Sequence, residues 1–209
     1  MMQKGIRKNT VVVGISGGSG AAVGKRVVDL LLEAQVPVAL TASNAGRQVW
    51  QQEMEYAFAD AVKEWNHDDR FSFHPVNQTG SLIASGTAPT AGMIVAPCSM
   101  ATVAAITTGI ADNLLRRAAD VTIKERRRLV LMPRETPLSE IHLENMQKLA
   151  RIGVSIMVPA PAFYLHPKSV DDIVEYLARK AIDALRIENT GLPETLIYTG
   201  MPENPTSEE

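Results

Sequence analysis

The chain has 209 residues, of which 45% are hydrophobic and 21% are charged, and this is the composition of an ordinary globular domain. Its 21 basic and 23 acidic residues leave a net charge of −2, which gives no global field to hold nucleic acid or an anionic membrane. The single cysteine, Cys98, excludes an internal disulfide and a zinc site built from cysteines. It favours a reducing compartment, and we expect the cytoplasm. The four histidines lack metal-ligand spacing, so no metal site is predicted.

Apolar runs alternate with helical patterns along the chain. Short apolar runs predict strands at 10–15, 36–42, 93–96, 129–132 and 154–158. Apolar residues at helical spacing predict helices at 21–34, after a cap at Ser43, at 112–126, at 139–152, and from Ser169 with Asp172 to about 187. Such alternation predicts one doubly wound α/β domain over 1–209, with a parallel sheet covered on both faces. Its core is expected at about 10–187, with a mobile tail at about 200–209.

One long stretch has no charged residue. Neither Asp, Glu, Lys nor Arg occurs between Phe71 and Ala111, a length that could span a bilayer. Prolines, glycines and many Ser and Thr residues interrupt it, which argues against a lipid-facing helix. We interpret it as loops and one strand that are buried or that line a site, and as uncharged surface for a homo-oligomer larger than a dimer.

A glycine-rich loop follows the first predicted strand, with the sequence Gly14-Ile15-Ser16-Gly17-Gly18-Ser19-Gly20. Its backbone N–H groups and the next helix can approach a phosphate. The dinucleotide pattern fails because residue 23 is Val, and Ser43 stands where an NAD site needs an acid. A Walker motif is excluded because Arg26 follows Lys25. A mononucleotide or flavin loop fits better than NAD or ATP, and a tight structural turn remains the alternative.

Seven of the 21 basic residues lie between 116 and 134. Arg126 to Arg128 are interpreted as a solvated face. Arg117 and Lys124 are two helical turns apart on one face, and Arg134 follows the fourth predicted strand, at the edge where parallel sheets bind ligands. We expect these three cations to converge on a phosphate. Two carboxylates, Glu135 and Glu53, are expected beside these cations. They either accept a proton or take part in a salt bridge.

Five motifs, in order, resemble the UbiX flavin prenyltransferases over residues 10 to 187. They are the loop Gly14–Gly20, Pro97-Cys98-Ser99, Arg117-Ala118-Ala119-Asp120 through Lys124-Glu125-Arg126-Arg127, Pro133-Arg134-Glu135-Thr136-Pro137-Leu138, and Phe163-Tyr164 followed by Pro167 and Ser169-Val170-Asp171-Asp172. The resemblance implies a flavodoxin-like fold and a dodecamer that binds FMN between subunits. It implies transfer of a dimethylallyl group from its phosphate to N5 and then C6 of reduced FMN, without metal. The prenylated FMN serves decarboxylases of the UbiD family.

The resemblance also assigns residues. FMN is expected at Gly17, Gly18, Ser19, Ser43, Ser99, Met100, Ala101, Thr102 and Arg134. Dimethylallyl phosphate is expected at Arg117, Lys124, Arg134, Tyr164 and Lys180. Catalysis is expected from Ser19, Glu53, Lys124 and Glu135, and Tyr198 is the candidate for an aromatic residue that closes the site.

Two other functions remain open. Flavin-dependent decarboxylases of cysteine-type substrates look similar in fold and FMN use, but they require an Asn-containing segment where this chain has Pro97-Cys98-Ser99-Met100-Ala101-Thr102. A non-catalytic carrier of flavin or prenylated flavin is the alternative from a different class.

Overall fold

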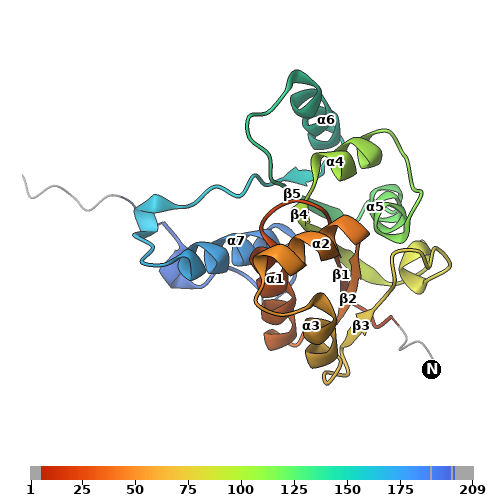
Figure 1. Ribbon diagram of the computed structural model, residues 1–209, viewed down its shortest axis with the longest axis horizontal. Coiled ribbons are helices and arrows are strands. Elements are labelled where there is room, and N and C mark those ends of the chain that lie inside the picture. Colours follow the sequence, from red (N-terminus) through yellow and green to blue (C-terminus); the bar gives the residue numbers. More distant parts are fainter. Residues whose placement is uncertain (1–5, 189, 199, 201–209) are drawn as a thin grey trace, which may run out of the picture.

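The computed structural model describes residues 6–188, 190–198 and 200. Its centre is a parallel sheet in the strand order β3-β2-β1-β4-β5-β6 (Figure 1). The strands are β1 (Thr10–Ile15), β2 (Val38–Ala42), β3 (Phe71–Phe73), β4 (Thr90–Cys98), β5 (Arg128–Pro133) and β6 (Ser155–Ile156). Without the short edge strand β3, this order is the 2-1-3-4-5 of flavodoxin-like sheets. The predicted doubly wound, flavodoxin-like fold is confirmed.

Helices cover both faces of the sheet. One face carries α1 (Ala21–Glu33), α2 (Asn44–Glu53), α3 (Phe58–Trp65) and α7 (Val170–Ala184), and the other carries α4 (Met100–Thr107), α5 (Leu114–Lys124) and α6 (Glu140–Arg151). Short 3₁₀ turns lie at Leu82–Ala84, Phe163–Leu165 and Glu194–Leu196. Each face therefore has its own apolar core, and the carboxyl ends of all strands meet at one edge of the sheet.

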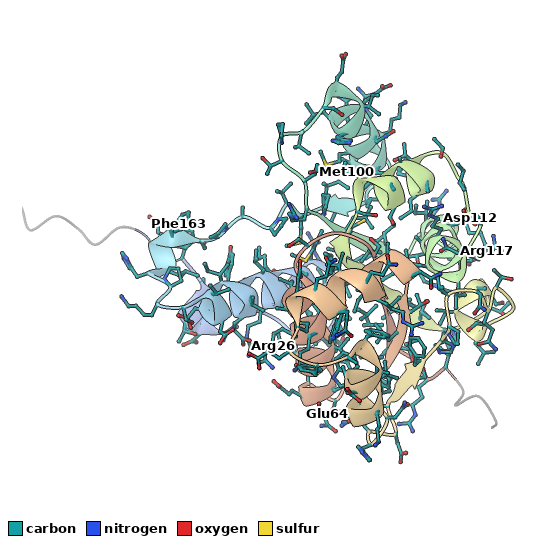
Figure 2. All side chains as sticks on the ribbon, viewed as in Figure 1. Arg26, Glu64, Met100, Asp112, Arg117 and Phe163 are labelled. Atoms are coloured by element: carbon teal, nitrogen blue, oxygen red, sulfur yellow. The ribbon has the colours of Figure 1, made fainter. Side chains whose placement is uncertain are left out.

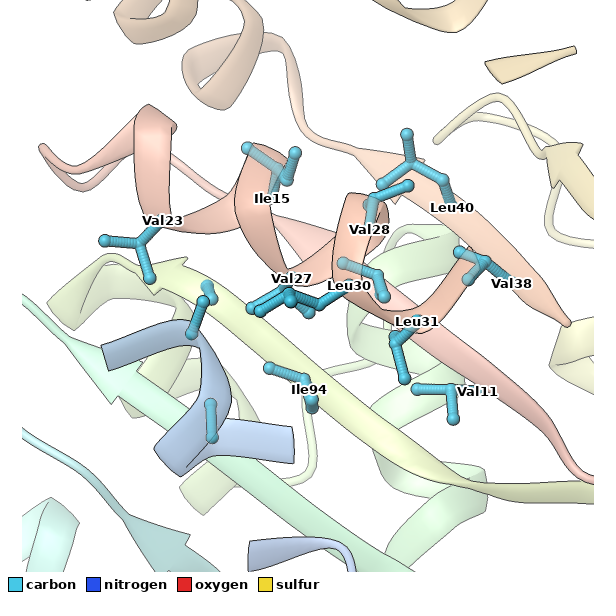
Figure 3. Close-up of a cluster of buried hydrophobic side chains, with 14 of the residues drawn as sticks. Val11, Ile15, Val23, Val27, Val28, Leu30, Leu31, Val38, Leu40 and Ile94 are labelled. Atoms are coloured by element: carbon cyan, nitrogen blue, oxygen red, sulfur yellow. The ribbon is translucent and has the colours of Figure 1, made fainter. Parts of the chain in front are cut away.

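The central strand β1 shows why the sheet has two cores. All of its residues are buried, and successive side chains point to opposite faces. Val11 and Ile15 join the cluster under α1, which Figure 3 shows, whereas Val12 joins the cluster under α4 and α5. Burying each such side chain contributes about 1.5–3 kcal/mol, so the two covered faces explain the continuous apolar run.

The predicted elements differ from the observed ones mainly at their ends. β4 begins at Thr90 rather than 93, because its small residues Ala91 and Gly92 resemble a loop in sequence. β2 begins at Val38, after Pro37, which has no N–H for the ladder. β6 has only two residues. The elements α3, β3 and α4 were not predicted. All of the predicted tail except Gly200 lies outside the described residues.

The uncharged stretch from Phe71 to Ala111 contains β3, β4 and α4, so it combines buried strand with loop and helix as expected. Among the described residues, no helix combines the length and the apolar character that a bilayer span requires.

Candidate functional site

The loops that follow four strands are tied together at the carboxyl edge of the sheet. The Ser99 N–H donates a hydrogen bond of 2.8 Å to Ser16 Oγ, and the Ser16 N–H donates one of 3.1 Å to the Pro97 carbonyl. The Ser43 N–H donates to the Ile15 carbonyl at 2.9 Å, and the Arg134 N–H donates to the Cys98 carbonyl at 3.2 Å. These hydrogen bonds join the four loops into one rim at the carboxyl edge of the sheet.

The glycines of the first loop are required by packing within the chain. A Cβ atom on Gly17 would lie 2.7 Å from Ala45 Cβ, and one on Gly18 would lie 3.2 Å from the Cys98 carbonyl oxygen. Gly20 has φ of 114°, in the left-handed region, where α1 begins. The tight-turn interpretation thus accounts for these glycines. The same turn lets the loop lie against both α2 and the end of β4.

Glu53, the last residue of α2, caps α1 from outside the helix. Its carboxylate accepts hydrogen bonds from the Gly20 and Ala21 N–H groups at 2.9 and 2.8 Å. Burial opposes its charge, but the Ser19 hydroxyl, these two N–H groups and nearby Arg134 together hold the pKa of Glu53 below its usual range. Glu53 is therefore an anion beside Ser19 and Arg134, at the positive end of a helix.

A pocket of about 180 Å³ opens next to this group. Ser19, Gly20 and Arg134 supply its polar side. Its other lining residues are apolar and come from α1, the ends of β4 and β5, the segment after β6, and α7: Val23, Pro97, Met132, Pro159 and Leu177. The arrangement suits a short hydrocarbon chain that carries an anionic end group.

Three hydroxyl groups, those of Ser43, Ser99 and Thr102, lie around the rim. Ser43 Oγ caps α2 by accepting from the Gly46 N–H at 3.0 Å, so its own hydrogen remains available. Ser99 Oγ caps α4 by accepting from the Thr102 N–H at 3.3 Å, and it lies 3.0 Å from Thr102 Oγ1. Met100 is buried at the start of α4, whereas Ala101 is exposed. This set of donors, with the Arg134 cation, fits a phosphate-bearing ligand with polar oxygens.

Arg134 and Glu135 do not pair with each other. In the described part of the chain neither residue forms an ion pair, and both are exposed. Glu135 Oε1 instead accepts from the Thr136 N–H at 3.0 Å. The salt-bridge alternative for this pair is therefore wrong for the single chain, and the Glu135 carboxylate stays accessible to a bound group.

The expected convergence of three cations does not occur within one chain. Lys124 forms an ion pair with Glu125 and lies against Gly86, four residues before β4 begins. Arg134 lies beside Cys98, where β4 ends. Nine strand residues separate these ends, or roughly 26 Å at 3.3 Å per residue. α5 runs antiparallel to the strands, so its two-turn spacing carries Lys124 to the opposite edge of the sheet.

Arg117 and Tyr164 also lie far apart. Figure 2 shows Arg117 on one flank of the molecule. Phe163, the neighbour of Tyr164, lies at the far end of a projecting arm, which is the segment 157–170 between β6 and the start of α7. Arg117 pairs with Asp120 at 2.7 Å. Tyr164 is 52% exposed, and its ring lies edge-on to that of Tyr198, with centroids 5.3 Å apart. Lys180, which is three residues after Leu177 of the pocket, pairs with Asp183 at 3.3 Å.

Comparison with known proteins identifies the chain. A family model described as Flavoprotein matches residues 2–182. The flavin prenyltransferase UbiX of Halalkalibacterium halodurans is 42% identical over 189 residues, which are 88% of this chain and 92% of that protein. The chain belongs to the UbiX family of flavin prenyltransferases.

Two solved structures extend the likeness to UbiX proteins. AnUbiX (PadA1), crystallised with FMN and dimethylallyl pyrophosphate, is 36% identical with a TM-score of 0.84, over 94% of this chain and all of that one. A dodecameric FMN-dependent UbiX-like decarboxylase from Escherichia coli O157:H7 is 39% identical with a TM-score of 0.83, over 91% of this chain and all of that one. The UbiX likeness therefore includes the whole carboxyl edge.

Residues of two kinds were not predicted. Ser16, which joins the loops after β1 and β4 by hydrogen bonds, lies in the predicted glycine-rich loop but was not assigned a role. The apolar lining of the pocket was missed because its five residues come from distant segments. For Leu177 a signal existed: it lies three residues before Lys180, on the same face of α7.

Proposed function

We propose that this protein is a flavin prenyltransferase of the UbiX type. It transfers a dimethylallyl group from dimethylallyl phosphate to N5 and C6 of reduced FMN, without a metal ion, and its prenylated FMN is used by a UbiD-type decarboxylase. The observation that carries this proposal is the meeting of Ser19, Glu53 and Arg134 at the mouth of an apolar pocket. Family membership supports the reaction, and this geometry supports a site for it at the carboxyl edge of the sheet.

FMN would be held along the rim by Gly17, Gly18, Ser19, Ser43, Ser99, Met100, Ala101, Thr102 and Arg134. When bound, reduced FMN supplies the electron-rich N5 and C6 atoms that receive the dimethylallyl carbons. The Ser43 hydroxyl hydrogen can donate to phosphate or ribityl oxygens, and so can one hydrogen of the Ser99–Thr102 hydroxyl pair. The apolar pocket would hold the dimethylallyl chain beside the ring system.

Charge and proton movements fall to the residues at the pocket mouth. The phosphate oxygen must leave as its bond to the allylic carbon breaks, and the Arg134 guanidinium can stabilise the charge it carries away. The Ser19 hydroxyl donates to the ionised Glu53 carboxylate, so this pair can accept a proton beside the phosphate. Ring closure would bond C6 to the alkene of the transferred group, adding one proton to that alkene and removing one from C6. Glu135, which has no cationic partner among the described residues, can carry this proton.

The remaining phosphate ligands would come from neighbouring subunits. Arg117, Lys124 and Tyr164 do not converge with Arg134 in one chain. These three residues and Lys180 all have exposed or half-exposed side chains. A homo-oligomer, as in the dodecameric relative, would bring such residues to the open pocket mouth. We therefore propose a dodecamer, located in the cytoplasm, with its active sites at subunit junctions.

The test is to incubate the protein with FMN, dithionite and dimethylallyl phosphate in chelator, and to weigh the released flavin by mass spectrometry. A flavin heavier by one dimethylallyl unit supports the proposal. Unmodified FMN that stays bound would instead support the carrier alternative. Loss of carbon dioxide from a cysteine-terminated peptide would support the decarboxylase alternative, which the absence of Asn from segment 97–102 disfavours.

A further inference from the structure

A broad hollow lies at the amino-terminal edge of the sheet, opposite the proposed active site. Its volume is about 970 Å³, and it gathers the segments that precede β1, β2 and β5 and the segment that follows α7. Five exposed cations line it: Arg7, Lys8, Arg126, Arg128 and Arg186. Among the described residues of the lining, Glu188 is the one acidic residue. The proposed reaction uses none of these residues.

These cations have no partner that accounts for them. None of the five takes part in an ion pair within residues 6–188, 190–198 and 200. Arg127 is different, because it donates to Thr90 Oγ1 at 2.7 Å and to the Gly86 carbonyl at 2.6 Å, and so holds the edge together. The other five are free to meet a ligand.

Helix dipoles offset only part of this positive charge. Helices α1, α5 and α7 end at this edge, just before Gln35, Arg126 and Arg186. Each helix end carries about half a negative charge. Three such ends offset about one and a half of the five positive charges, and Glu188 offsets one more, so the hollow keeps a net positive charge.

The hollow is not built to hold a phosphate or a base. The N–H groups of Gln35, Arg126 and Arg186 donate to carbonyls in the preceding helix turns at 2.9 to 3.0 Å, so these turns offer no anion-binding backbone. No aromatic side chain is present in the lining for base stacking. Its exposed cations instead surround an apolar floor, in which Pro37, Ala91 and Ile187 are half-buried and Val36 and Leu185 are buried. An apolar centre with a charged rim is typical of a protein-binding surface.

We propose that this hollow, the amino-edge basic surface, docks an acidic segment of another protein whose carboxylates meet the rim and whose apolar side chains meet the floor. Docking at this edge would leave the opposite, catalytic edge open to flavin. The inference does not depend on the proposed prenyl transfer, because it uses only residues outside that site.

The test measures binding of a fluorescein-labelled peptide of Glu-Glu-Leu repeats to the full chain by fluorescence anisotropy. Charge reversal at three rim positions, Arg126→Glu, Arg128→Glu and Arg186→Glu, should weaken binding by roughly 10- to 100-fold. Raising the salt concentration from about 20 to about 200 mM should strongly weaken peptide binding by the unmodified protein and should change binding by the variant little. The matched control reverses three exposed charges elsewhere, Lys63→Glu, Arg151→Glu and Lys168→Glu, and should bind as the unmodified protein does.

Other outcomes would overturn the proposal. Equal binding of a Gln-Gln-Leu peptide would remove the role of charge. Tighter binding of oligothymidylate or tripolyphosphate than of the acidic peptide would assign the surface to phosphate ligands. A change of oligomer mass in the rim variant, seen by light scattering, would make it a contact between copies of this chain. If the Glu variant fails to fold, Arg→Gln at the same positions gives the same test with a smaller expected loss.

Discussion

Glu53 has both a structural and a chemical position, because one carboxylate caps α1 and faces Ser19 and Arg134. We expect Glu53→Ala to lower stability by about 1 kcal/mol, as loss of a helix cap does. For a chain of this size that is a fall in Tm of about 2–4 °C. Because the folded pKa of Glu53 is lowered, its stabilising effect is present above its unfolded pKa of about 4.3 and is lost as the pH falls through the folded value.

Thermal melting at several pH values measures this effect. The difference in Tm between the native chain and Glu53→Ala should be largest at neutral pH and should disappear in acid. Glu55→Ala, at a neighbouring exposed carboxylate, is the matched control. A gap that persists unchanged in strong acid would show that the cap does not depend on the charge of Glu53.

Glu135 is a different case, since its carboxylate contacts only the Thr136 N–H among the described residues. Glu135→Gln keeps the size and the acceptor oxygen but removes the base. Prenylation should fall about 100- to 10,000-fold, with FMN affinity nearly unchanged. Turnover per bound flavin and the Kd for FMN are measured on one preparation. Normal turnover with weakened FMN binding would make Glu135 a structural residue only.

Helix α1 shows how closely an element must approach the sheet to position the site. A Cβ on Gly24 would lie 2.3 Å from the Ala96 carbonyl oxygen, next to Pro97 of the pocket. Gly24→Ala should therefore push α1 outward, destabilise the protein by about 1–3 kcal/mol and weaken FMN binding. Gly80→Ala is the matched control, because no atom lies within 4 Å of its added Cβ. It should stabilise slightly, by about 0.4–1 kcal/mol, and chemical denaturation compares the two.

The same elements show what sequence patterns could predict. β1 was predicted well because it is a short, continuous apolar run, and α1 because its apolar residues recur at helical spacing. α6 and α7 begin at Ser139 and Ser169, whose side chains cap the helices. β3 was missed because three residues are too few for a pattern. α4 was missed because apolar and small residues occur all around it, which leaves no amphipathic stripe.

Lys124 was misplaced for a reason that the sequence itself contains. Helical spacing puts it on the same face as Arg117, but that spacing says nothing about which edge of the sheet each residue reaches. Lys124 precedes β5 by four residues, whereas Arg134 follows β5 by one. In a parallel sheet these positions lie at opposite edges. By contrast, the placement of Ser19, Ser43 and Arg134 at the carboxyl edge was predictable because each follows the end of a strand.

At the scale of the whole molecule, the projecting arm exposes several large apolar side chains. Phe163 is 73% and Val170 75% exposed. We expect a homo-oligomer larger than a dimer in which the arm is covered. Phe163→Asp should lower the mass seen by light scattering toward the 22.7 kDa of one chain, with little change in the fold, whereas Phe163→Leu should not. An unmodified protein of 22.7 kDa at micromolar concentration would contradict the proposed assembly.

Sites at subunit junctions make a sharper prediction, because they require residues from two chains. Arg117→Ala and Arg134→Ala should each be nearly inactive alone. If Arg117 of one chain and Arg134 of its neighbour complete one site, oligomers reassembled from an equal mixture should regain about a quarter of the activity, since random pairing restores both arginines at that share of junctions. A mixture of Ser19→Ala with Arg134→Ala is the control, because both changes disable the same side of the junction and no pairing restores it. If the first mixture regains no activity while its oligomer mass is unchanged, the whole site lies within one chain.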